Sequence, residues 1–422
     1  MSLPIPAELV EHAIDSLHND VHALAACALA SRALLPRARF HIWRKVTLLV
    51  DGDPLHARIQ GLLKILDTSP DIAHIVQSLT LNGTGVASSE ARNRIHDYWD
   101  DPEGAMLLWE KLPNLRILKF VLLSFHNGLY QLIPFACSLP NLEELALIGF
   151  DAAPKTVHPA SPPSRNSLVQ SHTPPKLKRL SLTAGRVSWL FLEDLAKVLL
   201  EPGMHAPLET LDLFCSVASL NSRVSPRYST DAVFSQAWAP VIASLAQTLR
   251  HCTLGLLTED CSPANPAHLY GSLKRCTHLR SLSLVCFVHP TDTVGHRPSL
   301  FLDALADLLL SPADSPPPFP RFETLSVELL QDYELVLDGC ADACAKLADA
   351  LGDRTRYPHL KRVAICAKTL EQHSGPIDDN LSVGEELKEQ EALCRSCFGR
   401  MEAVGVQVEI SIGGPWEGYV SW

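Results

Sequence analysis

A short apolar pattern recurs along the chain and limits the folds that the chain can adopt. The pattern consists of an apolar residue, two variable residues, an apolar residue, one variable residue and a third apolar residue. Its last two apolar residues alternate with a variable one, which is typical of a half-buried β-strand. One such unit cannot cover its own apolar face, so the units are expected to stack on one another. Nine copies occur in order, beginning at Val76, Leu115, Leu142, Leu177, Leu208, Leu249, Leu279, Phe322 and Leu360.

The intervals between the copies leave room for helices. From Leu115 onward, successive copies start 27 to 43 residues apart. Apolar residues at helical spacing predict helices in five of the stretches between or before them, at residues 55–66, 129–136, 190–199, 300–309 and 340–351. A strand, a helix and a further strand in this order favour parallel neighbouring strands. The sequence therefore predicts an α/β solenoid from residue 47 to residue 412, with the strands on its concave side and the helices on its convex side.

Two stretches and the C-terminus depart from this pattern. Residues 151–176 and 312–320 are rich in proline and small polar residues, and we expect both to be mobile loops. A last strand is predicted at residues 406–412. Residues 413–422 contain Trp416, Tyr419 and Trp422, which are expected to cap the final apolar edge of the stack, although an aromatic ligand-binding box is an alternative.

Residues 1–46 predict three short helices. Pro6 suits the first turn of one helix, Asp20 can cap a second, and Pro36 can open a third. Three helices of this length cannot bury enough apolar surface to be stable alone. Their apolar faces must therefore pack against the rest of the chain or against another protein.

The run Leu3-Pro4-Ile5-Pro6-Ala7-Glu8-Leu9 and the apolar residues that follow it resemble an F-box. That resemblance implies that the three helices bind a Skp-type adaptor, which connects such proteins to a cullin and a RING ubiquitin ligase. The family usually has a cysteine followed three residues later by a tryptophan, and this chain has Ser31 and Leu34 there. Carried over by position, the adaptor-binding residues are Ile5, Pro6, Leu9, Ile14, Leu17, Leu24 and Leu29.

The recurring pattern resembles the leucine-rich repeat, although the repeats here are longer than the usual 20 to 29 residues. Together, the two resemblances imply the substrate receptor of a ubiquitin ligase, which holds the adaptor with its N-terminal helices and a target protein with its repeats. The alternative is an interaction scaffold with the same fold, in which residues 1–46 only cap the solenoid.

Composition narrows the possible locations and partners. The net charge is −11, from 47 acidic against 36 basic residues, and no basic run is long enough to follow a phosphate backbone. We therefore expect no nucleic-acid partner. The acidic first twenty residues do not support a secretion signal, and no apolar run reaches membrane-spanning length. The twelve cysteines lie mostly in apolar windows, which favours reduced thiols in the cytoplasm or the nucleus.

Motifs that carry catalysis or metal binding are weak in this sequence. Cys394 and Cys397 have the spacing of a zinc half-site, but no second pair is evident, so we favour cysteines on a helix face. The same interpretation applies to Cys340 and Cys344. No nucleophile elbow, phosphate loop or zinc-protease motif is present. We expect no enzymatic activity, cofactor or metal, although catalytic groups can assemble from distant positions.

Overall fold

The computed structural model describes residues 6–49, 55–83, 102–121, 123, 136, 139–152, 176–187, 189–200, 207–217, 230–258, 267–288, 298–310, 316–331, 340–369 and 381–415. The chain divides into two compact units. The first contains residues 1–150 and 155–177, and the second contains residues 151–154 and 178–422. Both units are α/β, with parallel strands that follow one another in chain order.

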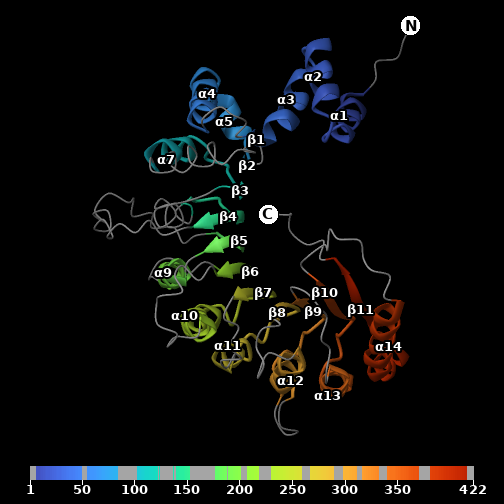
Figure 1. Cartoon of the computed structure of the whole chain (residues 1–422). Coiled ribbons are helices and arrows are strands. Elements are labelled where there is room, and N and C mark those ends of the chain that lie inside the picture. The colour runs from blue at the N-terminus through green and yellow to red at the C-terminus, as the bar shows by residue number, and fades with distance from the viewer. Residues whose placement is uncertain are drawn as a thin grey trace. The chain divides into compact units, whose positions relative to one another are not determined.

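The first unit begins with the three expected short helices and continues into four parallel strands (Figure 1). The elements are α1 (Ala7–Ser16), α2 (Val21–Ala30), α3 (Leu35–Arg44), β1 (Lys45–Leu49), α4 (Leu55–Thr68), α5 (Pro70–Ile75), β2 (Ser78–Asn82), α7 (Pro102–Glu110), β3 (Ile117–Val121) and β4 (Glu144–Ala152).

The second unit contains seven parallel strands, and its helices α9 to α14 lie along one side of them (Figure 1). The elements are β5 (Arg179–Val187), α9 (Trp189–Leu199), β6 (Thr210–Val217), α10 (Thr230–Ser244), β7 (His251–Thr258), α11 (Ala267–Leu273), β8 (Ser281–Val288), α12 (Pro298–Leu309), β9 (Thr324–Gln331), α13 (Cys340–Gly352), β10 (Arg362–Thr369), α14 (Leu381–Cys397), α15 (Gly399–Ala403) and β11 (Gln407–Pro415).

The recurring apolar pattern marks the buried face of each strand. In the second unit, Leu211 pairs in register with Cys252, and Cys252 pairs with Leu282. The third residue of each pattern is matched in the same way, as in Leu213 and Leu254. Each apolar residue thus contacts its counterpart in the next repeat, and all nine predicted copies lie at or directly before a strand. This solenoid-like packing confirms the parallel α/β prediction.

Backbone hydrogen bonds connect the repeats just before each strand. The N–H of Arg250 donates to the carbonyl oxygen of Glu209 at 2.8 Å, and the N–H of Arg280 donates to that of Arg250 at 2.7 Å. Charged side chains at the same positions also pair between repeats. Arg250 Nη1 lies 3.6 Å from Glu209 Oε2, and Glu323 accepts a 2.6 Å hydrogen bond from Lys361 Nζ. Interactions with Lys361 and Arg280 lower the pKa of the Glu323 carboxyl. The edge where the strands begin is therefore held by both the backbone and side chains.

Two prolines that precede copies of the pattern, Pro113 and Pro140, are followed by asparagines that join neighbouring repeats. Asn114 Nδ2 donates to the carbonyl oxygen of His74 at 2.8 Å, and Asn141 Nδ2 donates to that of Pro113 at 2.8 Å. These bonds satisfy one carbonyl group at the end of α5 and one in the turn before β3.

Four of the five predicted helices are confirmed, as α4, α9, α12 and α13. The fifth prediction, residues 129–136, lies outside the described residues apart from the buried Ala136. Strand β1 was not predicted as a strand, although Trp43, at the end of α3, and Val46 and Leu48, in β1, repeat the apolar spacing.

The predicted loops and tail need correction at their ends. Asp151 and Ala152 belong to β4, so the first loop starts too early in the prediction, and residues 153–175 lie outside the described part of the chain. Residues 316–320 form neither helix nor strand, but Phe319 is fully buried and so belongs to the core. The last strand runs to Pro415, three residues into the predicted tail, and Trp416, Tyr419 and Trp422 lie outside the described residues.

Candidate protein-binding surface

Helices α1, α2 and α3 have a small apolar core of their own. Ile14, Leu24 and Ala38, one from each helix, are 3%, 0% and 0% exposed. Partly buried apolar side chains surround them, and these are Val10, Leu17, Cys27, Ala28, Leu34 and Ile42. The helices thus pack on one another, and this core determines which of their apolar residues remain outside.

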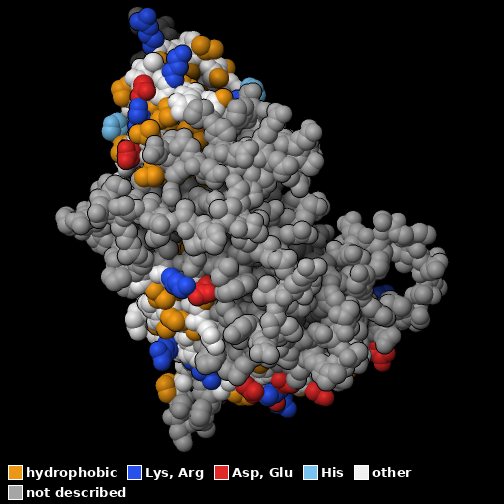
Figure 2. Space-filling view, turned by 60° about the vertical axis from the view of Figure 1, so that its left-hand side comes forward, with side chains coloured by type: hydrophobic (Ala, Val, Ile, Leu, Met, Phe, Trp, Pro, Cys, Tyr) orange, Lys and Arg blue, Asp and Glu red, His pale blue; other side chains and the backbone are white. Residues whose placement is uncertain are grey.

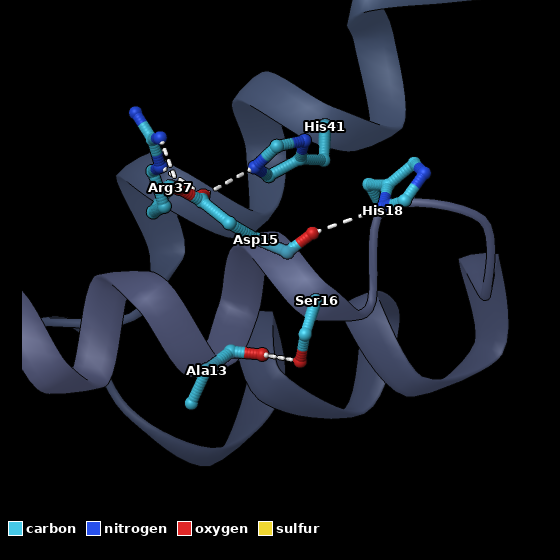
Figure 3. Close-up of polar contacts among 6 residues, drawn as sticks. All are labelled: Ala13, Asp15, Ser16, His18, Arg37 and His41. Atoms are coloured by element: carbon cyan, nitrogen blue, oxygen red, sulfur yellow. Dashed lines mark hydrogen bonds and ion pairs between the residues drawn. The ribbon is translucent and has the colours of Figure 1, made fainter.

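An ion-pair cluster joins α1 to α3 beside this core (Figure 3). Both oxygens of the Asp15 carboxylate accept hydrogen bonds from Arg37, from Nε at 2.5 Å and from Nη2 at 2.6 Å. His41 Nε2 lies 2.7 Å from Asp15 Oδ1. An ionised carboxylate only accepts hydrogen bonds, so Nε2 must carry the proton. These bonds from Arg37 and His41 hold the pKa of Asp15 well below its usual range.

The ends of these helices are fixed by local hydrogen bonds. The Asp20 carboxylate accepts a 2.9 Å bond from the N–H of Ala23 and so caps α2, as its position in the sequence predicted. Ser31, where the F-box family usually has a cysteine, accepts a 3.2 Å bond from the N–H of Ala33. Ser31 therefore helps to shape the turn between α2 and α3.

Helix α3 connects the helical segment to the first repeats. Arg39 Nη1 forms a 2.8 Å ion pair with Asp71 of α5, and Arg44 Nε donates a 3.1 Å hydrogen bond to Gln77 Oε1. Strand β1 follows α3 without a loop. These contacts leave large parts of α1 and α2 uncovered.

The seven residues predicted to bind an adaptor fall into different environments. Leu9 is 60% exposed and Leu29 is 90% exposed, and Pro6 at the start of α1 is also exposed. Leu17 is half-buried against the core. Ile14 and Leu24 are buried inside the segment, so they are not available on its surface. Ile5 lies outside the described residues.

Further exposed apolar residues on the same helices were not singled out from the sequence. Val21 on α2 is 57% exposed and Leu35 on α3 is 40% exposed. Val21, Ala25 and Leu29 follow one another at four-residue spacing, which places them along one side of α2. That spacing was a signal available in the sequence. Figure 2 shows hydrophobic side chains at the surface of the N-terminal helices, at the top of the view.

The strand face opposite the helices of the second unit is a separate candidate surface. In five consecutive strands, β5 to β9, the residue between the two buried positions of the pattern is polar and only half-buried. These residues are Ser181, Asp212, Thr253, Ser283 and Ser326. On the same face, the ring of Phe214 lies so close to Gly255 that a Cβ at Gly255 would be 2.4 Å from ring atom Cδ2. A glycine at this position lets an aromatic ring lie flat on the sheet.

The metal-site alternative finds no support in the described part of the chain. Among the residues that the structure describes, no three His, Cys, Asp or Glu side chains are grouped in a way that could hold a metal ion. Cys340, Cys344 and Cys394 are buried, and Cys397 is half-buried. Of the described helices, none is long and apolar enough to cross a membrane.

No family model matches this chain, and no curated protein matches it.

The ion pairs of Asp15 predict that the helical segment is sensitive to acid. A depressed carboxyl pKa stabilises the folded state above the ordinary aspartate pKa of about 3.9, and this stabilisation is lost as the pH falls through the folded pKa. We therefore expect the protection of α1 and α3 against hydrogen exchange, relative to the intrinsic exchange rate at each pH, to fall below about pH 4. Asp15→Asn should show faster exchange at neutral pH and a weaker dependence on acid. Hydrogen-exchange mass spectrometry, with wild type and variant compared at each pH, measures both effects.

Asp20→Asn is the matched control, because asparagine caps a helix as well as aspartate does. It should leave the exchange of α1 and α3 unchanged at neutral pH. Equal exchange in wild type and Asp15→Asn would contradict a stabilising role for the ion-pair cluster.

Proposed function

We propose that this protein is a substrate-recruiting subunit of a cullin-RING ubiquitin ligase. Its N-terminal helices would bind a Skp-type adaptor, and its repeats would bind the target protein. The observation that carries the proposal is the set of exposed apolar side chains on α1 and α2, led by Leu9 and Leu29. Large apolar residues exposed together on one small segment are typical of a protein-binding surface.

The exposure of each side chain on α1 and α2 indicates which residues would contact the adaptor. Pro6, Leu9 and Leu29 come from the F-box-like positions, and Val21 adds to them on α2. Ile14 and Leu24 would act indirectly, since they hold the helices in place. The F-box-like run at the start of the chain agrees with this assignment.

The mechanism would be proximity rather than catalysis. A target bound to the repeats and an adaptor bound to the helices would be held in one complex, which raises the local concentration of a target lysine near the ligase. The transfer chemistry would belong to the partner subunits. The polar strand face of the second unit, with its five half-buried polar side chains, is the surface we propose for the target. Such a complex would work in the cytoplasm or the nucleus.

A capped scaffold is the competing function, and the contacts of α3 favour it. The ion pair of Arg39 with Asp71 and the hydrogen bond of Arg44 with Gln77 fasten α3 to the first repeats, as a cap would require. A cap alone, however, gives no reason for the exposure of Leu9, Val21 and Leu29. Binding to the adaptor distinguishes the two functions.

The test is capture of the full-length chain by a purified Skp-type adaptor. Wild type should bind, and the double variant Pro6→Ala, Leu9→Asp should lose at least about tenfold in affinity, because a carboxylate in an apolar interface weakens binding by more than about 1.4 kcal/mol. Leu107→Asp is the matched control, since Leu107 on α7 is similarly exposed, at 53%. It should bind as wild type does.

Circular dichroism of each variant verifies that the chain is folded. No adaptor binding by folded wild type would contradict the ligase proposal and leave the capped scaffold. Equal weakening by the double variant and by Leu107→Asp would show that binding does not depend specifically on the α1 surface.

A further inference from the structure

Four cysteines meet where α13 packs against α14. Cys340 and Cys344 lie one turn apart on α13, and Cys394 and Cys397 lie one turn apart at the end of α14. Cys340, Cys344 and Cys394 are 2%, 1% and 3% exposed, and Cys397 is half-buried. The cluster lies in the second unit, whereas the helices proposed to bind the adaptor belong to the first.

The thiols of Cys344 and Cys394 contact each other across the two helices. A side-chain hydrogen bond joins them. Cys397 contacts α13 differently, because its Sγ lies 3.5 Å from the carbonyl oxygen of Ala341 and 3.4 Å from that of Leu393. Cys344 and Cys394 are therefore a pair whose thiols are joined directly across the two helices.

The hydrogen bond makes the two thiols chemically unequal. The Cys344 thiol donates to Cys394, which lowers the pKa of Cys394. The same bond, together with burial, raises the pKa of Cys344. The thiolate is the form of cysteine that reacts with peroxides and disulfides. Cys394 is thus the nucleophile of the pair, and Cys344 is placed to react with it afterwards.

We propose that Cys344 and Cys394 form a reversible disulfide that links α13 to α14 when the protein meets a peroxide. In the first step, the Cys394 thiolate attacks one oxygen of hydrogen peroxide. The O–O bond breaks, the sulfur becomes a sulfenic acid, and the released hydroxide takes a proton to become water. In the second step, the Cys344 sulfur attacks the sulfenic sulfur, and a second water leaves with the proton of Cys344. Two thiols and one peroxide thus give one disulfide and two waters.

Burial sets the conditions for this reaction. Peroxide must reach Cys394 through local opening of α14, whose neighbouring Cys397 lies nearer the surface. The reaction is therefore slower than at an exposed thiol. Once formed, the disulfide closes the chain between Cys344 and Cys394 and restrains α14, which is also held to β11 by a 3.0 Å hydrogen bond from Arg395 Nη2 to the carbonyl oxygen of Ile410.

A second pair of buried cysteines serves as an internal comparison. Cys252 and Cys276 are both 2% exposed or less. The thiol of Cys276 points to the carbonyl oxygens of Ile242 and Ser272, each at 3.8 Å. Burial raises the pKa of Cys276 to about 12. Cys252 and Cys276 should therefore stay reduced under conditions that oxidise Cys344 and Cys394.

The experiment treats the native full-length chain with hydrogen peroxide and maps its disulfides. After treatment, free thiols are blocked with N-ethylmaleimide, and the digest is analysed by mass spectrometry with and without dithiothreitol. A linked peptide pair containing Cys344 and Cys394 is expected, lighter than the sum of the two peptides by two hydrogens and lost on reduction. Hydrogen exchange in α14 should slow in the oxidised protein and recover with dithiothreitol.

Variants separate this link from its neighbours. Cys344→Ala and Cys394→Ala should abolish the linked peptide and the slower exchange of α14, whereas Cys340→Ala, at an equally buried position, should keep both. A link between Cys394 and Cys397, a link between Cys252 and Cys276 at the same peroxide dose, or full N-ethylmaleimide labelling of Cys344 and Cys394 after treatment would overturn the proposal. Mapping of the wild type decides the question even if a variant fails to fold.

Discussion

Replacing Phe322 by alanine is expected to lower the free energy of unfolding of the second unit by about 3–5 kcal/mol. Phe322 is fully buried at the first position of the pattern before β9. Its ring centroid lies 5.5 Å from that of Phe319 and 6.2 Å from that of Tyr357. Alanine would remove the ring and leave a cavity between two aromatic side chains that cannot both move to fill it.

Tyr357 explains why the surroundings of Phe322 cannot collapse. The Tyr357 hydroxyl donates a 2.8 Å hydrogen bond to the carbonyl oxygen of Leu309 at the end of α12. Burial raises the pKa of Tyr357 to about 12, so the hydroxyl stays protonated. The bond fixes the tyrosine ring between α12 and the turn before β10. The cavity is therefore expected to remain open, so the loss of unfolding free energy should not be reduced by rearrangement of its surroundings.

A urea titration followed by hydrogen-exchange mass spectrometry of β9 and β10 peptides measures this loss. Phe301→Ala is the matched control, because Phe301 on α12 is only half-buried. This variant should lower the free energy of unfolding clearly less than Phe322→Ala does. Equal midpoints for wild type and Phe322→Ala would show that the aromatic cluster contributes little to the stability of the unit.

The strands were predictable from the sequence because their register repeats the sequence pattern. Leu180, Leu211 and Cys252 occupy the same position in neighbouring strands, so each repeat needs an apolar residue at that position. Strand β1 was missed because its pattern overlaps the end of α3, where Trp43 also fits a helix. Phe319 was placed in a loop because consecutive prolines precede it, although its ring is buried.

The candidate surface was only partly predictable, for a different reason. Leu9 and Ile14 are both apolar residues in one ten-residue helix, and the sequence alone does not fix which side of so short a helix faces its neighbours. The structure decides this through contacts between distant residues, such as the ion pair of Asp15 with Arg37, 22 positions later. No local pattern predicts that pairing. The thiol contact of Cys344 with Cys394 likewise results from the packing of α13 on α14, and the CxxC spacing of Cys394 and Cys397 does not predict it.

Two leucines on α2 test the assignment of core and surface in the helical segment. Leu24→Ala is expected to destabilise α1 to α3 by about 2–5 kcal/mol, because Leu24 is fully buried between the helices. Leu29→Ala makes the same chemical change at a side chain that is 90% exposed, and it should alter stability by no more than about 0.5 kcal/mol. Hydrogen exchange of peptides from α1, α2 and α3 in the full-length chain measures both.

The same pair of variants separates stability from binding. If α1 and α2 bind an adaptor through their exposed face, Leu29→Ala should weaken capture while leaving hydrogen exchange unchanged. Leu24→Ala should weaken capture only to the extent that it unfolds the segment, and a stabilising osmolyte should restore capture. If α1 to α3 exchange hydrogen as slowly in Leu24→Ala as in wild type, the three-helix core would be contradicted. A Leu29→Ala variant that is folded and fully bound would move the adaptor contact away from the end of α2 and towards Pro6 and Leu9.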